Sequence, residues 1–328
     1  MAWDSVPWFT EGGAEHSSEL ARLLAYAAFG GAEGVVGARD LQVRALSSPA
    51  ASVQIRTGAC AITNRAAGAA YQSYAARLPV AEQIPIAATG ATARSDLVVA
   101  RIENPYSYGE TWPNPPDPKV GPYVFTRVIS GVPKTTTHVG QVRSSDSAIA
   151  LARIDIPANT ASITQTMIKD LREMVSPRRR RVVRHLHGVW DTPDEVGNIK
   201  EPNWEMFPNG ARWDIEIPEW ATQLFVQATW AQLDQRNPYH AYGYLRVRVG
   251  SRATKSTRYN CDWVGSPQRH TFVGGGRLYI PASMRGTVQT VTMEGSGRKG
   301  DKGVLEVDGG SVVFTDLEFV EAPDEDES

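Results

Sequence analysis

Apolar and polar residues alternate along most of the chain, which is the pattern of β-strands with one buried and one wet face. In the segment YLRVRVG, Leu245, Val247 and Val249 point one way, while Arg246 and Arg248 point the other. The segments LQVRAL, SVQIRTG, RWDIEIP and VQTVTME show the same period of two. Clean alternation is typical of antiparallel sheets. We therefore predict a mainly β protein.

One segment near the start has the period of a helix instead. Within residues 17–29, Leu20, Leu23 and Leu24 recur at spacings of three and four and therefore share one face of a helix. Serines that can cap the first turn precede them, and a glycine pair follows the segment. We expect this apolar face to dock on the rest of the protein. A second, short helix is predicted over residues 164–174.

Two segments of the first half resemble each other. The order Ala-Arg-Ile followed by an acid occurs at residues 100–103 and again at residues 152–155, and a proline follows each copy. Two such strands can lie side by side, with the arginine of each copy facing the acid of the other. Opposite charges that face each other across a strand pair contribute about 0.2–1 kcal/mol. Strand geometry therefore explains the repeat without a catalytic role.

A chain of 328 residues is long for one domain and comfortable for two. We place a helix-bearing, β-rich attachment domain at residues 1–176, a basic linker at 177–184, an antiparallel β-sandwich of jelly-roll type at 185–320 and an acidic tail at 321–328. The proline-rich segment at residues 104–122 is predicted to be an exposed loop.

The balance of 34 Lys and Arg against 36 Asp and Glu gives a net charge of -2, which creates no overall field for nucleic acid or membrane. No apolar run approaches the ~20 residues of a membrane span, and the N-terminus lacks the pattern of a signal peptide. Cys60 and Cys261 are expected to be reduced and buried. We expect a protein that is made in the cytoplasm and that has no metal or other cofactor.

The strongest cluster of charge is a run of four arginines, Arg178, Arg179, Arg180 and Arg181. Arginines bind phosphates, but nucleic-acid sites add interleaved aromatic residues or a reading element, and neither is present beside this run. We therefore expect no nucleic-acid partner. An exposed linker, or an inter-subunit contact with the acids of a neighbouring subunit, is favoured.

Paired histidines and paired carboxylates are two further candidates for chemistry. His185 and His187 would share a strand face, but a zinc site needs ligands that the sequence does not supply. Asp214 and Glu216 also share a strand face, and more acids cluster at residues 191–195; two carboxyl groups about 5–10 Å apart can hydrolyse a glycosidic bond. Acids on a strand face are more often solvated surface. We predict no enzyme, and a tail-associated polysaccharide-degrading enzyme is the alternative.

Aromatic residues of the second half are the better lead to a ligand. Trp204, Tyr239, Tyr242 and Tyr244 lie in or beside predicted loops, next to Asn, Gln and Arg residues. Planar rings can stack on sugars while neighbouring polar side chains bind hydroxyl groups. These four residues are the candidates for binding a glycan. The alternative is that the rings only close off the sandwich.

The segments GVVGARDLQVRAL, SVQIRTGACAI, SDLVVARIENPYSYG and LARIDIPANTASIT follow one another in this order over residues 30–172. This part of the chain resembles the N-terminal region of minor tail proteins of long-tailed bacteriophages that infect actinobacteria. The segments IEIPEWATQLFVQATWAQL, MRGTVQTVTMEGSG and SVVFTDLEF resemble the β-sandwich that often ends such proteins. These motifs are architectural, and none of them carries over a catalytic residue.

The resemblance implies a structural protein of the virion's tail tip or baseplate, synthesised in the cytoplasm of the host bacterium. Its first domain would attach to other tail proteins. Its second domain would project toward the host cell envelope and contribute to recognition of the cell surface, with an envelope glycan as the partner. Such proteins are symmetric homo-oligomers, with a trimer favoured. A purely structural or decorating tail subunit is the other alternative.

Overall fold

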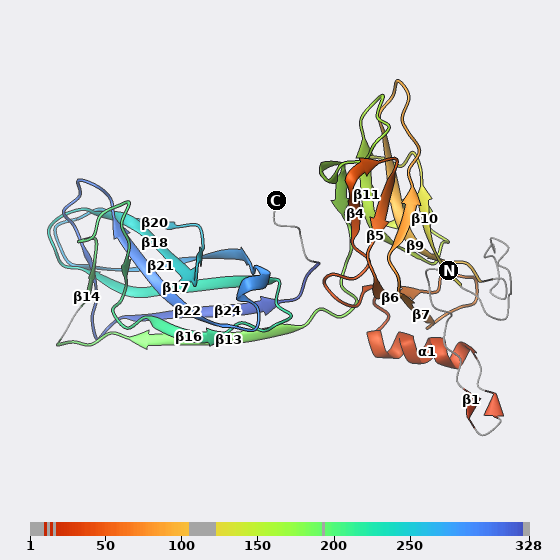
Figure 1. Ribbon diagram of the computed structural model, residues 1–328. Helices are drawn as coiled ribbons and strands as arrows, with labels where there is room; N and C mark the ends of the chain where they lie inside the picture. The colour runs from red at the N-terminus through yellow and green to blue at the C-terminus, as the bar shows by residue number, and fades with distance from the viewer. Residues whose placement is uncertain (1–9, 12–13, 16–17, 105–122, 192–193, 324–328) are drawn as a thin grey trace. The chain divides into compact units, whose positions relative to one another are not determined.

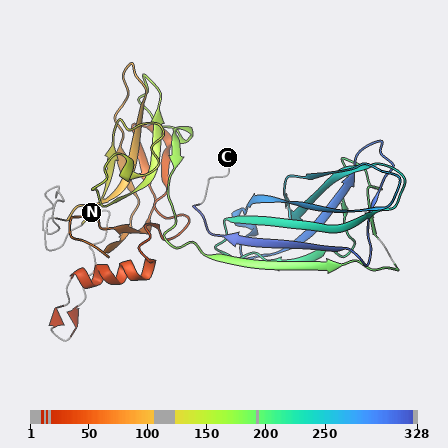
Figure 2. The ribbon, with the colours of Figure 1, turned by 180° about the vertical axis from the view of Figure 1, so that it is seen from behind.

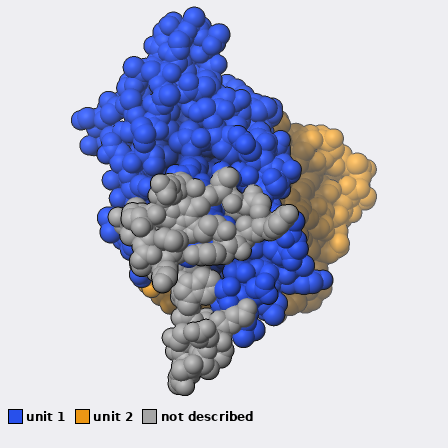
Figure 3. All heavy atoms as spheres, turned by 90° about the vertical axis from the view of Figure 1, so that its right-hand side faces the viewer, with its two compact units in different colours: residues 1–177, 323–328 blue, residues 178–322 orange. Residues whose placement is uncertain are grey.

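The chain divides into two compact units, which Figure 3 shows in different colours. Strands dominate both units, and the described residues contain one α-helix, so the prediction of a mainly β protein is confirmed. The computed structural model describes residues 10–11, 14–15, 18–104, 123–191 and 194–323.

Unit 1 comprises residues 1–177 and 323–328, and unit 2 comprises residues 178–322. Each unit has a buried core of its own. The predicted proline-rich loop lies outside the described residues from residue 105 on, and the predicted acidic tail does so from residue 324 on.

Unit 1 is built from short sheets around one main core, and a second, smaller buried cluster includes Leu97 and Val99 (Figure 1). Its elements are, in chain order, β1 (Thr10–Glu11), β2 (Ala14–Glu15), α1 (Ser18–Phe29), β3 (Gly34–Val35), β4 (Val43–Ala50), β5 (Ser52–Ile55), β6 (Gly58–Thr63), β7 (Ser73–Leu78), β8 (Glu82–Pro85), β9 (Arg94–Ile102), β10 (Val124–Ile129), η1 (Val139–Gln141), β11 (Ala148–Ile156), η2 (Gln165–Met167) and β12 (Ile168–Asp170). The larger sheet has the order β10-β9-β11-β12, and two smaller sheets have the orders β3-β6-β7 and β4-β5-β8. Val98 and Ile154 of the larger sheet share a buried cluster with Ile55 and Ile62 of the smaller ones.

The two repeated segments lie in β9 and β11, which are neighbours in the sheet, as predicted. The pairing is antiparallel, so the two copies run in opposite directions and their matching residues do not lie opposite each other. Arg101 is opposite Ala148, and Arg153 is opposite Leu97. The predicted contact between each arginine and the acid of the other copy is therefore wrong. Arg153 instead binds the acid of its own copy, with its Nε atom 2.9 Å from Asp155 Oδ1.

The helix α1 forms where the sequence predicts it, but its apolar face is not docked. Leu20, Leu23 and Leu24 are 46%, 45% and 56% exposed. The expectation that these leucines pack on the rest of the protein is therefore wrong. A helical period identifies the residues that share a face, but it does not identify the face that the tertiary structure buries.

Polar and aromatic contacts hold the opposite face of α1 against β7 (Figure 1). The buried residue of the helix is Arg22, whose Nε atom donates a hydrogen bond to Gln72 Oε1. Its guanidinium group also lies 5.4 Å from the centre of the Tyr74 ring. Tyr26 meets Tyr71 edge to face, with 5.7 Å between the ring centres.

Residues 164–174 do not form the predicted second helix. The single turn η2 is followed directly by β12, which pairs with β11 and places Ile168 opposite Ile154. The edge of the larger sheet needs a partner for its backbone, and the β-branched Ile168 suits a strand. Tertiary pairing therefore overrides a helical spacing that extends over only a few residues.

Unit 2 is an antiparallel β-sandwich. Its elements are β13 (Arg179–His187), β14 (Asp194–Val196), β15 (Glu205–Met206), β16 (Arg212–Glu216), β17 (Gln223–Gln235), β18 (Ala241–Val249), β19 (Arg252–Ala253), β20 (Thr257–Cys261), β21 (Gln268–Tyr279), η3 (Ala282–Met284), β22 (Val288–Gly297), β23 (Leu305–Val307) and β24 (Val312–Val320). The eight strands of at least five residues form two sheets, in the orders β13-β24-β17-β21 and β16-β22-β18-β20. One sheet thus holds the first, last, third and sixth of these strands and the other holds the second, seventh, fourth and fifth, which is the strand order of a jelly roll.

The two sheets of unit 2 bury one core between them. Leu245, Val247 and Val249 of β18 point into this core, as their alternation predicts. Trp230 of β17 and Phe319 of β24 reach the same cluster from the other sheet and are fully buried.

The predicted linker at residues 177–184 is wrong, because the basic segment from Arg179 on is strand β13. This strand lies at the edge of its sheet and pairs with β24 along its whole length (Figure 2). Val182 and Leu186 are four residues apart, so they lie on one face of the strand, and both pack against the core. This packing places in a sheet a segment whose charge indicates a linker. Glu321, at the start of the predicted acidic tail, is also buried.

Both cysteines are free and buried, as expected. Burial raises the pKa of the Cys60 thiol to about 12 and that of the Cys261 thiol to about 11, so both remain protonated at neutral pH. No helix in the described part of the chain is long and apolar enough to cross a membrane.

A network of charged side chains ties the end of β17 to β21 and to the turn after β23. The carboxylate of Asp308 accepts hydrogen bonds from Arg269 Nη1 at 2.7 Å, from Arg236 Nη2 at 3.1 Å and from the main-chain N–H of Gly310 at 2.9 Å. The contact with Arg269 is the main cause that lowers the pKa of Asp308 to about 2.

We expect this network to make unit 2 sensitive to acid. A carboxyl group whose folded pKa is lowered stabilises the fold above its unfolded pKa of about 4, and this stabilisation disappears as the pH falls through the folded pKa. One pKa unit corresponds to about 1.4 kcal/mol, so Asp308 contributes on the order of 2 kcal/mol at neutral pH. Asp308→Asn should lower the free energy of unfolding at pH 7 and flatten its dependence below pH 4, as measured by urea unfolding. The exposed Asp214→Asn is the control, and an unchanged acid response in Asp308→Asn would contradict the expectation.

Candidate ligand-binding surface

The outward face of the sheet β16-β22-β18-β20 collects three of the four predicted aromatic residues. β18 presents Tyr242, Tyr244, Arg246 and Arg248 on this face, because the residues between them are buried in the sandwich. β20 adds Arg258 directly opposite Tyr244. Trp204 lies beside these strands, just before β15.

The neighbouring strands continue this face. β22 places Thr292 opposite Arg248 and Glu294 opposite Arg246, and β16 places Arg212 opposite Thr292. The surface therefore carries four arginines on three strands. We refer to it as the arginine face, defined by Arg212, Arg246, Arg248 and Arg258.

Trp204 is not an open platform for stacking. The guanidinium group of Arg246 lies 3.8 Å from the centre of the indole ring, within the range of a cation–π interaction. Arg246 Nε also donates to Glu294 Oε2 at 2.6 Å, and Arg248 Nε donates to Glu294 Oε1 at 2.6 Å. One largely buried carboxylate thus holds two arginines, and one of these arginines covers the ring.

Tyr242 has neighbours on several sides. Its ring stacks with His240 at a centroid distance of 5.9 Å, and the guanidinium of Arg298 lies 4.7 Å from the ring centre. Its hydroxyl donates a hydrogen bond to the carboxylate of Asp262. This hydrogen bond raises the pKa of the Tyr242 hydroxyl, because ionisation would place a phenolate beside a carboxylate.

The other two predicted aromatic residues also lie near cations. Arg258 is 5.7 Å from the centre of the Tyr244 ring. Tyr239 lies apart, between β17 and β18; it is 47% exposed, and Lys302 Nζ is 5.8 Å from its ring centre. The structure therefore brings three of the four predicted residues together, and each of the four has a cation near its ring.

Spacing along the sequence reveals only part of the arginine face. Arg246 and Arg248 stand on the polar side of the same alternating segment as Tyr242 and Tyr244, so this signal is present in the sequence. Arg212 joins the face only through the register of β16 and β22, from a distant segment. The pairing of β16 with β22 cannot be read from the spacing of residues along the sequence.

Each of the four arginines predicted to contact a neighbouring subunit has an acidic partner within unit 2. The partners are Glu321 for Arg178 at 2.7 Å, Glu318 for Arg179 at 3.4 Å, Glu216 for Arg180 at 3.9 Å and Asp316 for Arg181 at 2.5 Å. The charge of the run is therefore balanced locally. A role for these residues between subunits stays a prediction.

The paired histidines and paired carboxylates lie on exposed strand surfaces. The rings of His185 and His187 meet edge to face on β13, 5.5 Å apart. Across the described ranges, no group of three or more potential ligands could hold a metal ion. Asp214 accepts a hydrogen bond from a threonine hydroxyl, and Glu216 lies 3.9 Å from Arg180. Local partners thus occupy both carboxylates.

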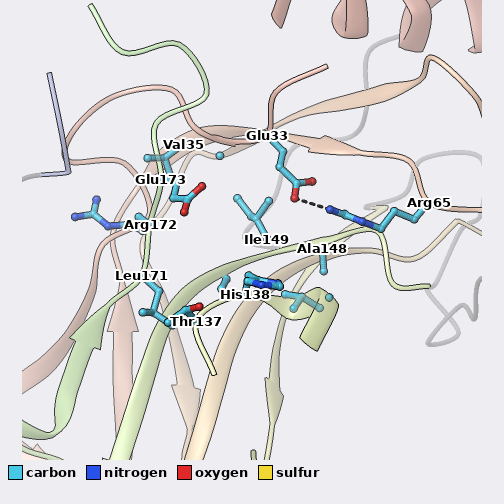
Figure 4. Close-up of a pocket in the computed structure, with 14 residues that line it drawn as sticks. Glu33, Val35, Arg65, Thr137, His138, Ala148, Ile149, Leu171, Arg172 and Glu173 are labelled. Carbon is cyan, nitrogen blue, oxygen red and sulfur yellow. Dashed lines mark hydrogen bonds and ion pairs between the residues drawn. The ribbon is translucent and has the colours of Figure 1, made fainter. Parts of the chain in front are cut away.

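Unit 1 contains a cavity of about 260 Å³ that sequence reasoning does not reveal (Figure 4). Its apolar lining includes Ile149 of β11 and Leu171 after β12. At one side Arg65 Nη2 pairs with Glu33 Oε1 at 2.5 Å, and His138 lines the cavity below them. These residues come from widely separated segments, so only the fold assembles them.

No protein-family model and no curated protein matches the chain. Among solved structures, the chain is similar to the VP2 subviral particle of infectious bursal disease virus, with 9% identity and a TM-score of 0.28 over 88% of this chain and 76% of that chain. It is also similar to the structure of the Gx strain of the same virus, with 10% identity and a TM-score of 0.27 over 88% of this chain and 73% of that chain. Likenesses at this level carry no argument about function.

We expect Trp204→Ala to destabilise unit 2 by roughly 1–3 kcal/mol, because it removes the ring beneath Arg246, the residue that pairs with the largely buried carboxylate of Glu294. Trp204→Phe keeps a ring at this position and should recover much of the loss. Denaturant unfolding followed by circular dichroism measures both effects. Equal stability of Trp204→Ala and the wild type would show that the ring has no structural role.

Proposed function

We propose that the chain is a structural protein of the tail tip or baseplate of a long-tailed bacteriophage. Unit 1 attaches to other tail proteins, and unit 2 takes part in recognition of the host cell surface. The resemblance of residues 30–172 to minor tail proteins supports the first part. The observation that carries the proposal is the apolar face of α1, where Leu20, Leu23 and Leu24 lie in water in a single copy. An assembly would bury this face.

A second copy of the same helix is the partner that this face suits best. The leucines recur at the spacing of a helical seam, in which like stripes pack against one another. Ala27 and Ala28 are also exposed and extend the stripe without a charged side chain. The stripe is therefore self-complementary, which supports a homo-oligomer. A trimer is the proposed state, because it matches the symmetry of a tail tip.

Leu23→Glu combined with Leu24→Glu should shift the full-length protein toward monomers, because it would bring carboxylates together in the seam. Light scattering over a range of concentrations measures the change. Val80→Glu is the control, since Val80 is also exposed on unit 1 but follows the end of β7, whereas the helix contacts Gln72 and Tyr74 at the start of that strand. A wild-type protein that is monomeric at every concentration would contradict self-association through α1.

The arginine face and its aromatic neighbours support a binding role for unit 2. They form a regular array on the outside of a sandwich, and the carboxylates Asp214 and Glu216 each have a local partner. This favours a binder over the alternative of a polysaccharide-degrading enzyme. The second alternative is a decorating subunit that touches only tail proteins. The position of the protein in the particle and its effect on adsorption distinguish this subunit from a host-binding protein.

Antibody fragments raised against the full-length protein should label the distal end of the tail in electron micrographs of intact particles. They should also reduce adsorption to host cells, because they cover unit 2. Label on the head or along the tail tube would overturn the proposed location. Label at the tip without any effect on adsorption would favour the decorating subunit.

A further inference from the structure

We propose that the arginine face of unit 2 binds an anionic polysaccharide of the host envelope, a polymer that repeats carboxylate or phosphodiester groups. This inference rests on the proposed role of unit 2 in host recognition and adds the chemical class of its ligand. It follows from the placement of four arginines on one sheet surface and from the way in which their charges are paired.

The arginines are spaced for a ligand that repeats. Strand β22 lies between β16 and β18, and its Thr292 is opposite Arg212 on one side and Arg248 on the other. These two arginines are therefore two strand spacings, about 10 Å, apart. Arg246 is two residues from Arg248 on β18, which corresponds to about 7 Å. A chain that carries an anion at intervals of this size meets several guanidinium groups at once. A single small anion meets only one or two.

The charges of the arginine face are only partly balanced. Glu294 is shared between Arg246 and Arg248, so one carboxylate serves two guanidinium groups. Within the described residues, no carboxylate forms an ion pair with Arg212 or Arg258, and both are exposed. The surface therefore retains positive charge in positions that a ligand can reach.

Two acids border this surface at one end of β16. Asp214 accepts a hydrogen bond from Thr290 Oγ1 at 2.7 Å, and Glu216 lies 3.9 Å from Arg180. These carboxylates disfavour an anionic chain at that end of β16.

Asp262, which follows β20 and accepts the hydrogen bond of the Tyr242 hydroxyl, disfavours an anion at the Tyr242 end of this face. The favourable path for the polymer therefore crosses β18 and β20 at Arg246, Arg248 and Arg258.

The cations beside the aromatic rings favour a charged ligand over a neutral one. Arg246 over Trp204 and Arg258 near Tyr244 occupy positions that a neutral sugar would need for stacking. The planar guanidinium group binds carboxylate and phosphate groups through two parallel hydrogen bonds, which a neutral sugar does not offer. Asn260, opposite Tyr242 on β20, supplies an amide for the sugar hydroxyls.

Binding of the full-length protein to defined polymers tests the proposal. Polygalacturonate carries carboxylates, poly(glycerol phosphate) carries phosphodiesters, dextran is the neutral polymer, and duplex DNA is a polyanion without sugar hydroxyls free for contact. We expect binding to at least one of the first two, weakening as salt is raised, and none to dextran. The stronger of the two identifies the anionic group. Equal binding to dextran, or tighter binding to DNA than to both acidic polymers, would overturn the proposal.

The matched variants are Arg212→Gln with Arg258→Gln, and Arg277→Gln as the control. Arg277 is an exposed arginine on the outward face of the other sheet, opposite Phe225. The double variant should weaken binding to the acidic polymer about tenfold or more, because it removes the two unpaired guanidinium groups. The control should bind as the wild type does. A double variant with wild-type affinity would refute the role of this face.

Adsorption of the same three proteins to intact host cells separates this inference from the proposed function. If the wild type and the control adsorb and the double variant does not, both stand. If all three adsorb equally, unit 2 still recognises the host but not through an anionic polymer on the arginine face. If the wild type does not adsorb in any oligomeric state, the proposed host recognition itself fails, and the inference fails with it.

Discussion

A β-strand has two faces, and the burial of one face between two sheets determines what the other can carry. In β18 this constraint is complete: Leu245 and Val247 fill the sandwich, so Tyr244 and Arg246 must point to solvent. The outward residues therefore stand on a surface that the core makes rigid. A binding surface of this kind does not depend on the conformation of a loop.

The period of two is also what the sequence makes most accessible. It predicts the inward residues of β18, while the repeated motif predicts that β9 and β11 are neighbours. It does not contain the register between strands, which decides that Arg101 lies opposite Ala148 and that Arg212 joins the row of Arg248. The faces of single strands could thus be predicted, whereas the ion pairs and the arginine face, which depend on register, could not.

Two errors of interpretation have related causes. The period of α1 correctly groups its leucines, but Arg22 finds a hydrogen-bonding and aromatic environment against β7, so the helix turns its apolar stripe outward. The arginine run reads as a linker because its charge dominates, yet Val182 and Leu186 place it in a sheet. In both cases the contacts of one or two residues with distant parts of the unit decide how the whole segment is placed. A single sequence does not identify such partners.

The position of β13 gives its arginines a further consequence. The strand has nine residues, and among the described residues its one neighbouring strand is β24, so its other edge has no strand partner there. Long open edges are templates for joining one sheet to another, and the risk rises wherever several copies come close together. A second strand that joined this edge would have to place its own side chains beside Arg179 and Arg181 and beside the acids that pair with them. Charged side chains along an open edge disfavour such pairing, so the run helps to keep each sandwich a separate folded body.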